Sequence, residues 1–343
     1  MQTTGHPREL GEGAPRVSIV LPLYNSSKGL SSALSELDKQ SYLDREIILV
    51  DDGSSDATYE AALTLASGRA DVRVVKTEHG GPSHARNEGL KRSRGEIIFF
   101  SESDCVYNPA YIQRAIDSLD SNPMAGAVCL TGAPLITRST LATRCIDIEN
   151  KVQHRLLERG KIEPFYAWVF RRSVLQQLGG FDEKLFQGED RDLFRRLKDA
   201  NHSVAWVPGV NWQHVRDQTL SQLASKWVKR GRTRLLFLVK HKRVADAMKS
   251  VLPFWATVLG VILLLWLPLV GAAILLTVVA LFLARTIQIM RISWSSIERK
   301  RSFLGYPLFI LVRNFSTALG YTLAAVTVLT RRIQGKDTSW ENL

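Results

Sequence analysis

Three short apolar runs in the first hundred residues end abruptly on polar or acidic side chains. The runs are residues 17–23, 47–50 and 97–100, and they are followed by Tyr24-Asn25, by Asp51-Asp52 and by Ser101-Glu102-Ser103-Asp104. Near-continuous apolar strands are typical of a parallel sheet that is covered on both faces. Ligands of such open sheets bind beyond the carboxyl ends of the strands. The pattern therefore predicts an α/β sheet with a polar site along one edge.

Segments with helical spacing of apolar residues separate these runs. The spacing predicts helices over 28–39, 58–67, 84–92 and 108–119, with a further strand over 72–76. Alternating strands and helices indicate right-handed βαβ units and a largely parallel sheet. Beyond residue 125 the pattern predicts strands over 127–131 and 168–170, a turn over 179–182 and a helix over 190–200.

The positive charge of the chain is concentrated in one place. The formal net charge is +12 over 343 residues, and residues 226–243 carry eight Lys and Arg with no acidic residue. A basic block just before a hydrophobic tract favours binding to an anionic membrane surface, and no nucleic-acid-binding motif accompanies it, so no nucleic acid is expected as a partner. Three cysteines without paired spacing indicate neither a disulfide framework nor a zinc site, and reduced thiols suit a cytoplasmic domain.

The C-terminal third of the chain is strongly apolar. Residues 251–284 contain no charged side chain, and one helix of that length would exceed a hydrocarbon core of about 30 Å. Pro268 near the middle predicts a helical hairpin over about 251–290, and basic residues on both flanks place both of its ends on the cytoplasmic side. A third apolar stretch, 303–330, contains Arg313, so it is either an interfacial or re-entrant helix or a span in which Arg313 is paired.

These features divide the chain into four parts. We expect a loose polar tail without a secretory signal over residues 1–15, a catalytic domain over 16–218, a basic interfacial segment over 219–250 and a membrane region over 251–343.

Two acidic groups at strand ends suggest binding chemistry. Asp51 and Asp52 suit a turn that caps a helix, but a carboxylate at a strand end can also accept hydrogen bonds from a ribose or a base. Glu102 and Asp104 project the same way if the segment is extended, and Mg²⁺ and Mn²⁺ prefer such oxygen ligands. The alternative for this second pair is a solvated loop.

A third acidic group, Glu189-Asp190-Arg191-Asp192, precedes a predicted helix. Acidic residues in a first turn stabilise the helix dipole, but a carboxylate here could also serve as a general base. The loop Gly80-Gly81 enters another helix, whose N-terminus could hold an anion, although glycines are equally good turn formers.

Taken together, these pieces resemble the family-2 glycosyltransferases of the A-type nucleotide-sugar fold, over about residues 16–231. The matching segments are VSIVLPLYN (17–25), EIILVDDGSSDAT (46–58), GGPSHARNEGLKRSRGEIIFF (80–100), SESDC (101–105), LGGFDEKLFQGEDRDLFRRL (178–197) and WQHVRDQTL (212–220). The resemblance implies a Rossmann-like, mainly parallel sheet flanked by helices, followed here by transmembrane helices.

The resemblance also implies roles for individual residues. The nucleotide pocket would be lined by Pro22, Tyr24 and Asn25. Asp52 would contact the base, and Asp51 or Arg86 would help to hold the nucleotide. Glu102 would also lie near the donor. Glu102 and Asp104 match the metal-binding pair, usually Asp-x-Asp, so the longer Glu102 is a departure and Asp104 the safer ligand. Asp190 matches the catalytic base, with Glu189 beside it, and His214 matches a histidine that touches metal or diphosphate, unless it is an ordinary packed or surface residue.

The implied enzyme is an inverting glycosyltransferase that uses Mn²⁺ or Mg²⁺ and transfers one sugar from a nucleoside-diphosphate sugar, with a UDP-sugar expected, to a lipid-linked or glycan acceptor. The absence of the Gln-x-x-Arg-Trp motif of processive synthases favours single transfer. We expect a multi-pass protein of the cell membrane, in contact with membrane lipids, with its catalytic domain on the cytoplasmic face. Two alternatives stay open: a polyprenyl-phosphate sugar synthase, and a non-catalytic membrane protein that binds a nucleotide sugar or a partner.

Overall fold

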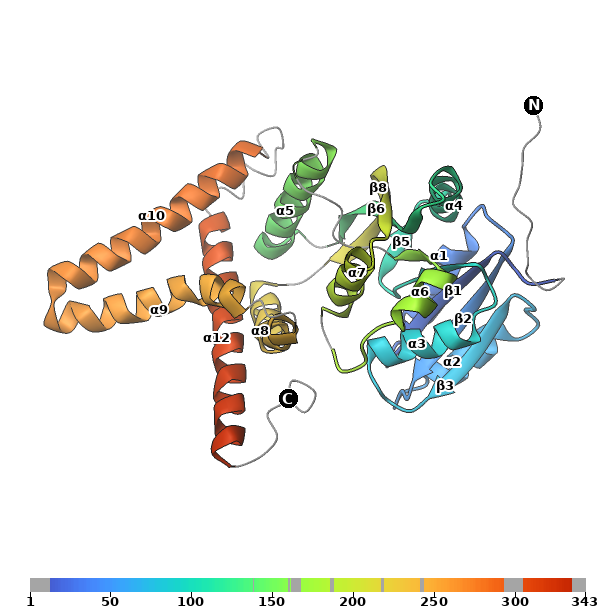
Figure 1. Cartoon of the computed structure of the whole chain (residues 1–343), viewed down its shortest axis with the longest axis horizontal. Helices are drawn as coiled ribbons and strands as arrows, with labels where there is room; N and C mark the ends of the chain where they lie inside the picture. The colour runs from blue at the N-terminus through green and yellow to red at the C-terminus, as the bar shows by residue number, and fades with distance from the viewer. Residues whose placement is uncertain are drawn as a thin grey trace. The chain divides into compact units, whose positions relative to one another are not determined.

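The computed structural model describes residues 13–137, 139–159, 161, 168–185, 188–216, 219–240, 244–292 and 305–334 (Figure 1). The chain divides into two compact units. The first takes residues up to 132, 164–183 and 189–213, and the second takes 133–163, 184–188 and the chain from 214 onward. Each unit is described by itself below.

The first unit is built on a mixed, mostly parallel sheet whose strand order is β3-β2-β1-β4-β7-β6-β8-β5. The strands are β1 (Val17–Leu23), β2 (Arg45–Asp52), β3 (Val72–Thr77), β4 (Ile97–Phe100), β5 (Cys105–Tyr107), β6 (Ala125–Ile136), β7 (Val169–Arg171) and β8 (Ser203–Arg216). The predicted parallel core is confirmed, because β1 pairs in parallel with both β2 and β4, and β2 with β3. The register sets Leu23 beside Asp51, so the polar residues after β1 and β2 share one edge.

Alternate residues of the strands point to opposite faces, and each face is covered by its own helices. The helices are α1 (Leu30–Asp38), α2 (Thr58–Ala66), α3 (Pro82–Arg92), α4 (Tyr111–Ser121), α6 (Arg172–Leu178) and α7 (Glu189–Asp199). Ile19 and Leu21 of β1 pack with α1, α2 and α4, whereas Val20 packs with α3, α6 and α7. This two-faced burial is the physical reason for the near-continuous apolar strands.

The second unit is helical. Its helices are α5 (Leu141–Glu158), α8 (Leu220–Lys240), α9 (Val244–Trp266), α10 (Pro268–Ile292) and α12 (Gly305–Ile333). Helix α9 ends at Trp266 and α10 begins at Pro268, the proline at which the sequence predicts the turn of the hairpin. Proline at the start of α10 suits the first helical position, where no backbone hydrogen bond is lost.

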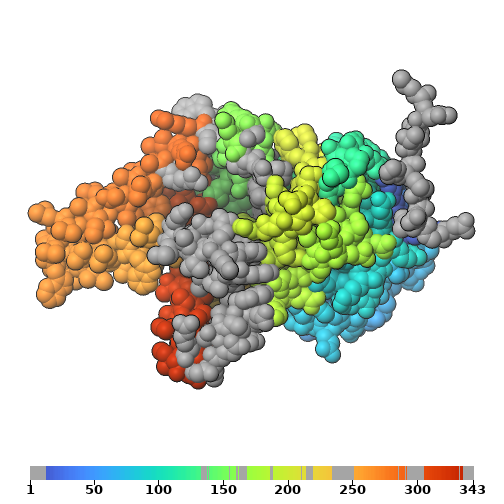
Figure 2. All heavy atoms as spheres, in the orientation of Figure 1, coloured from blue at the N-terminus to red at the C-terminus, as the bar shows by residue number. Residues whose placement is uncertain are grey.

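Two helices of the described chain are long and apolar enough to cross a membrane, Pro268–Ile289 and Gly305–Arg331, and Val251–Trp266 is a shorter apolar helix. Many large apolar side chains of α9 and α10 are exposed, and their surface is orange in Figure 2. Trp266 and Leu269, at the turn of the hairpin, are 80% and 86% exposed. An apolar surface of this kind typically marks a membrane or protein contact.

Arg313 of α12 is paired with Glu149 of α5, and Tyr306 donates a hydrogen bond to the same carboxylate at 3.0 Å. One of the alternatives for this stretch requires an ion-pair partner for Arg313, and Glu149 is such a partner. The first half of α12 is packed against α5 and α8, where Phe309 stacks edge-on with Trp227 at 5.2 Å between ring centroids. Close approach of α8 and α12 depends on Gly231 and Gly320, since a Cβ on Gly320 would lie 2.2 Å from the Val228 carbonyl oxygen.

Several element boundaries differ from the prediction. Strand β6 continues to Ile136, α7 begins at Glu189 and includes all the acidic residues of its first turn, and β5 and β8 were not predicted. Strand β8 contains Pro208 and Gly209, which interrupt the alternation that identifies a strand. The predicted extended conformation around Glu102 and Asp104 is wrong, because residues 103 and 104 form a turn.

Candidate functional site

The end of β2 holds two buried carboxylates with different surroundings. Asp52 is oriented toward the loop that follows β3: Oδ1 accepts from the Gly80 amide at 3.0 Å and Oδ2 from the Gly81 amide at 2.9 Å. His79 Nδ1 lies 2.9 Å from Oδ2 of the same carboxylate. Asp52 therefore fixes the glycine loop in front of α3.

Asp51, in contrast, has one carboxylate oxygen that can still accept a hydrogen bond. It is fully buried, its Oδ2 accepts from the Ser54 amide at 3.4 Å, and its Oδ1 has no hydrogen-bond partner among the described residues. A buried carboxylate oxygen without a donor is costly unless a ligand or water supplies one. This oxygen is suited to accept a hydrogen bond from a ribose hydroxyl.

The residues after β1 extend the same edge. Asn25 has φ of +47°, and its Oδ1 accepts from the Ser55 amide at 2.9 Å, which joins the turns after β1 and β2. Tyr24 is half exposed and stacks on His79, with 4.2 Å between ring centroids. Pro22, at intermediate exposure within β1, pairs with Val50. Tyr24, Asn25, Asp51 and Asp52 thus belong to one connected site.

Arg86 of α3 connects two other predicted groups. Its side chain is 5% exposed, and Nη1 lies 2.9 Å from Glu189 while Nη2 lies 3.7 Å from Glu102. The guanidinium also faces the rings of Trp168 and Phe181, at 5.1 and 5.3 Å from their centroids. Arg86 therefore holds together carboxylates that lie almost ninety residues apart in the sequence.

The pKa values of these two carboxyl groups are raised. For Glu102, burial is the largest cause, the Arg86 charge opposes it, and Asp104 adds to the rise. For Glu189, burial is again the largest cause, Arg86 opposes it and Asp190 adds to the rise. Both carboxyl groups lie where a positive charge would stabilise their ionised forms.

The residues present fit a divalent cation. The ligand atoms of Glu102, Asp104 and Cys105 lie within 4.8 Å of one another, and Asp104 is exposed. Carboxylate oxygens suit Mg²⁺ and Mn²⁺, which bind through one or two carboxylates and substrate phosphates. Burial raises the pKa of the Cys105 thiol, so this group stays protonated and is a poor ligand for a hard cation.

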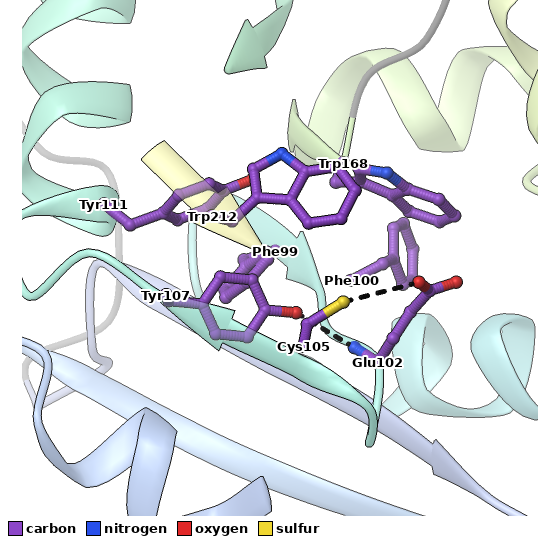
Figure 3. A pocket seen from close by; sticks show the side chains of 8 residues that line it. All are labelled: Phe99, Phe100, Glu102, Cys105, Tyr107, Tyr111, Trp168 and Trp212. Atoms are coloured by element: carbon purple, nitrogen blue, oxygen red, sulfur yellow. Dashed lines mark hydrogen bonds between the residues drawn. The ribbon is translucent and has the colours of Figure 1, made fainter. Parts of the chain in front are cut away.

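A small pocket adjoins the metal candidate, and the side chains that line it are drawn in Figure 3. The pocket is mainly aromatic, lined by Phe99, Phe100, Glu102, Cys105, Tyr107, Tyr111, Trp168 and Trp212. The Tyr107 hydroxyl accepts from the Glu102 amide at 3.1 Å, and the Cys105 thiol lies 3.6 Å from Oε2 of Glu102 (Figure 3). These contacts fix the turn that carries the acidic pair.

The first turn of α7 presents Glu189 and Asp190. Asp192 is fully buried and binds Arg196, which in turn donates to the carbonyl oxygens of Leu178 and Gly180, both at 2.7 Å. This arrangement fixes α7 against the preceding glycine turn. Oδ1 of Asp190 accepts a hydrogen bond from the Arg191 amide at 2.8 Å.

Helix α3 also contacts Phe181 and Glu183, which follow the glycine turn after α6. Asn87 accepts from the Phe181 amide at 2.8 Å and donates to the Phe181 carbonyl at 2.9 Å, and it donates to Glu183 at 2.8 Å. His84 binds the same Glu183 at 2.8 Å. Helix α3 therefore fixes Phe181 and Glu183, which precede α7 in the chain.

The predicted residues are brought together in two connected groups, around Asp51–Asp52 and around Arg86. His214 lies in β8, and its side chain is outside the described residues. The sequence reasoning missed His79, Cys105, Trp168 and Trp212. The only local signal for His79 is its place directly before Gly80-Gly81, whereas the two tryptophans come from distant segments and only pairing of the strands brings them to the site.

Comparison with known proteins agrees with this geometry. The model of the family "Glycosyl transferase family 2" matches residues 18–179. Glycosyltransferase AglE of Haloferax volcanii is 25% identical over 202 residues, which cover 57% of this chain and 66% of AglE. The glycosyltransferase EpsJ of Bacillus subtilis is 37% identical over 110 residues, 32% of each chain. The matches thus span two thirds or less of these relatives.

The fold is similar to that of a solved glycosyltransferase. The mannosyltransferase PcManGT from Pyrobaculum calidifontis, in complex with GDP-Man and Mn²⁺, superposes with a TM-score of 0.56 at 19% identity, covering 97% of this chain and 92% of that chain. Residues 18–179 of this chain therefore match the model of glycosyltransferase family 2, and the fold is similar to that of a solved glycosyltransferase.

Proposed function

We propose that this chain is an inverting, membrane-associated glycosyltransferase that uses a divalent cation. It moves one sugar from a nucleoside-diphosphate sugar, with a UDP-sugar expected, to a hydroxyl of a lipid-linked saccharide or other glycan precursor. The observation that carries the proposal is the connection through Arg86, which sets the Glu102–Asp104 pair beside the first turn of α7. The relative PcManGT is in complex with GDP-Man and Mn²⁺, and a ligand set of that kind would suit the oxygen donors here.

In the proposed reaction Asp190 removes the proton from the acceptor hydroxyl. The acceptor oxygen then forms a bond to the anomeric carbon, and the bond from that carbon to the diphosphate oxygen breaks, with inversion at the carbon. Glu102 and Asp104 would hold Mn²⁺ or Mg²⁺, which supplies positive charge for the diphosphate leaving group. Asp51 and the residues around it would hold the nucleoside, and His214 is proposed near the diphosphate.

We place the protein in the cell membrane, with the catalytic domain on the cytoplasmic side. The two long apolar helices and the basic sequence of α8 support this placement. Binding of that basic segment to anionic lipid would bring the site close to lipid-linked acceptors. Recovery of the full chain in the soluble fraction after an alkaline wash of the membranes would contradict it.

A thermal-shift panel of nucleotide sugars with Mn²⁺ tests the donor site. A donor at a hundred times its Kd should stabilise the fold by about 2.7 kcal/mol. Asp104→Asn should weaken the dependence of that shift on Mn²⁺, whereas Asp117→Asn, at an exposed position of α4, should leave it unchanged. If a donor binds but is neither transferred nor hydrolysed with Mn²⁺ or Mg²⁺, the protein is a non-catalytic binding module instead.

A further inference from the structure

We propose that α12 does not cross the bilayer but lies in the plane of the membrane–water interface, with the exposed cations of α8 at the level of anionic lipid headgroups. The inference rests on the proposed membrane association and goes beyond it, because it fixes the side of the membrane on which the C-terminus lies. By length and apolar composition Gly305–Arg331 could cross a membrane. The contacts of this helix within the second unit are what exclude a crossing.

The middle of α12 is packed tightly against a basic helix. A Cβ on Gly320 would lie 2.9 Å from the Cα of Gly231 in α8, beside α12 in Figure 1. The residues of α8 around this contact carry exposed, positively charged side chains, Lys229, Arg230 and Arg232. Charged side chains that face hydrocarbon are costly, whereas cations at an anionic membrane surface are attracted to it. The middle of α12 therefore lies where lipid headgroups or water reach these cations.

The first half of α12 is packed against a second charged helix. Arg313 is paired with Glu149 of α5, and Tyr306 donates to the same carboxylate at 3.0 Å. Helix α5 carries six charged side chains in 18 residues, and Asp147 and Lys151 form a further ion pair within it. Pairing of Arg313 thus does not by itself favour a span, because the partner belongs to a helix that is too polar to enter hydrocarbon.

A crossing would take both of these contacts into the bilayer. A helix needs about 20 residues to cross a hydrocarbon core of about 30 Å. Every stretch of that length within Gly305–Arg331 contains both Arg313 and Gly320. A spanning α12 would therefore carry charged parts of α5 and α8 into hydrocarbon, whereas a helix in the interface leaves them among headgroups and water.

The opposite side of α12 carries an apolar stripe. Its exposed large apolar residues are Leu308, Leu311, Leu319, Val326, Leu329 and Ile333. They follow one another after 3, 8, 7, 3 and 4 residues, each near a whole number of helical turns, so they lie on one side of the helix. A helix with one exposed apolar side and its other side on charged partners suits a membrane surface. The stripe would enter the boundary between headgroups and acyl chains.

Spin labels on the stripe test the orientation of α12. Leu308 and Val326 are 18 residues apart, which is five full turns and about 27 Å along the axis, so they face the same way. The full chain with Leu308→Cys or Val326→Cys is labelled and placed in vesicles of phosphatidylcholine and phosphatidylglycerol. The depth of each label is then measured by electron paramagnetic resonance. The three native cysteines are buried, which favours labelling of the introduced thiol.

We expect the two depths to differ by less than about 10 Å, since a helix in the interface holds both labels at one level. A larger difference would show that α12 is inclined across the bilayer and would overturn the inference. Leu276→Cys, on the exposed surface of α10, provides a reference within the hydrocarbon. Asp117→Cys, at an exposed position of α4, provides a reference in water.

The side of the C-terminus gives a second test. The full chain carries one epitope tag before Met1 and another after Leu343, and sealed, inverted membrane vesicles of the expressing cells are treated with protease. Both tags should be cleaved, because an interfacial α12 keeps the C-terminus on the side of the catalytic domain. Protection of the C-terminal tag alone would overturn the inference.

Failure of this inference and failure of the proposed function can be told apart in the same vesicles. Tags on opposite sides in vesicles that still transfer sugar would overturn the interfacial position of α12 alone. Tags on one side in vesicles that transfer no sugar would contradict the proposed reaction alone. Recovery of the tagged chain in the soluble fraction would overturn both the membrane association and the position of α12.

Discussion

Arg86 and Glu189 form a buried ion pair with 2.9 Å between Nη1 and Oε1, and they come from different helices of the same unit. The same guanidinium lies 3.7 Å from Glu102. The charge of this one side chain therefore stabilises the ionised forms of two carboxyl groups. Burial raises the pKa of both groups, and Arg86 opposes that rise. The consequence is that the acidic pair after β4 and the first turn of α7 depend on each other.

Replacement of Arg86 should therefore affect stability and transfer together. Arg86→Ala leaves two carboxylates in a buried site without their cation, which typically costs about 3–5 kcal/mol of unfolding free energy. We expect a lower thermal midpoint and little or no sugar transfer. Arg92→Ala removes an exposed i,i+4 pair with Glu88 on the same helix and should change stability by about 0.5 kcal/mol or less. Equal midpoints for the two variants would contradict this account.

Asp190→Asn should separate binding from chemistry. Since Asp190 is proposed to take the proton of an acceptor hydroxyl, the variant should lose about 10²–10⁴ in kcat while its Kd for the nucleotide sugar stays the same. Asp199→Asn, at the other end of α7, should keep full activity. Retained activity of Asp190→Asn would favour a polyprenyl-phosphate sugar synthase, because a lipid phosphate acceptor needs no such base.

Glu46 should make the stability of the first unit pH-dependent. Burial acts to raise the pKa of Glu46, but hydrogen bonds from Ser18 and Arg94 and the charge of Arg73 lower it overall. A carboxyl group whose pKa is lower in the folded state stabilises the fold at pH values above its unfolded-state pKa, near 4.3. This contribution is lost as the pH falls through the folded-state pKa.

The measurement is the thermal midpoint of Glu46→Gln between pH 3 and pH 7. At neutral pH the variant should be less stable by about 1–3 kcal/mol, and the difference from wild type should shrink as the pH falls. Glu60→Gln, at an exposed position of α2, provides the comparison and should behave as wild type. A difference that stays constant with pH would show that Glu46 acts through shape and not through its charge.

Gly320→Leu should separate α8 from α12. A Cβ on Gly320 would lie 2.2 Å from the Val228 carbonyl oxygen and 2.9 Å from the Gly231 Cα, so any side chain forces the helices apart. Overpacking of this kind costs about 1–3 kcal/mol or more. We expect a lower thermal midpoint of the full chain in detergent. Ala325→Leu, at an exposed position of the same helix, should leave that midpoint unchanged, and the same result for Gly320→Leu would exclude close packing here.

The parallel core of the sheet could be predicted because its signal is local. A strand such as β2, buried on both faces, needs a continuous apolar run, and the sequence shows that run directly. Strands β5 and β8 could not be predicted, because β5 has three residues and β8 contains Pro208 and Gly209. Their places depend on pairing with distant strands.

The candidate site was predictable in its residue types and not in its contacts. The sequence shows acids after β2 and β4, but not that Asp52 is turned toward the glycine loop, nor that residues 103 and 104 form a turn. Asp52, and not Asp51, accepts the hydrogen bonds of the loop amides because of the direction of each side chain at the strand end.

The sequence by itself determined the class of fold, the acidic edge and the apolar hairpin divided at Pro268, because each is expressed in the order and spacing of neighbouring residues. Only the tertiary structure decided that Arg86 compensates both Glu102 and Glu189, that His79 stacks on Tyr24 and that Arg313 is paired with Glu149. Such contacts join residues far apart in the chain, and their partners are chosen by packing and by the need to compensate buried charge, which no local pattern records.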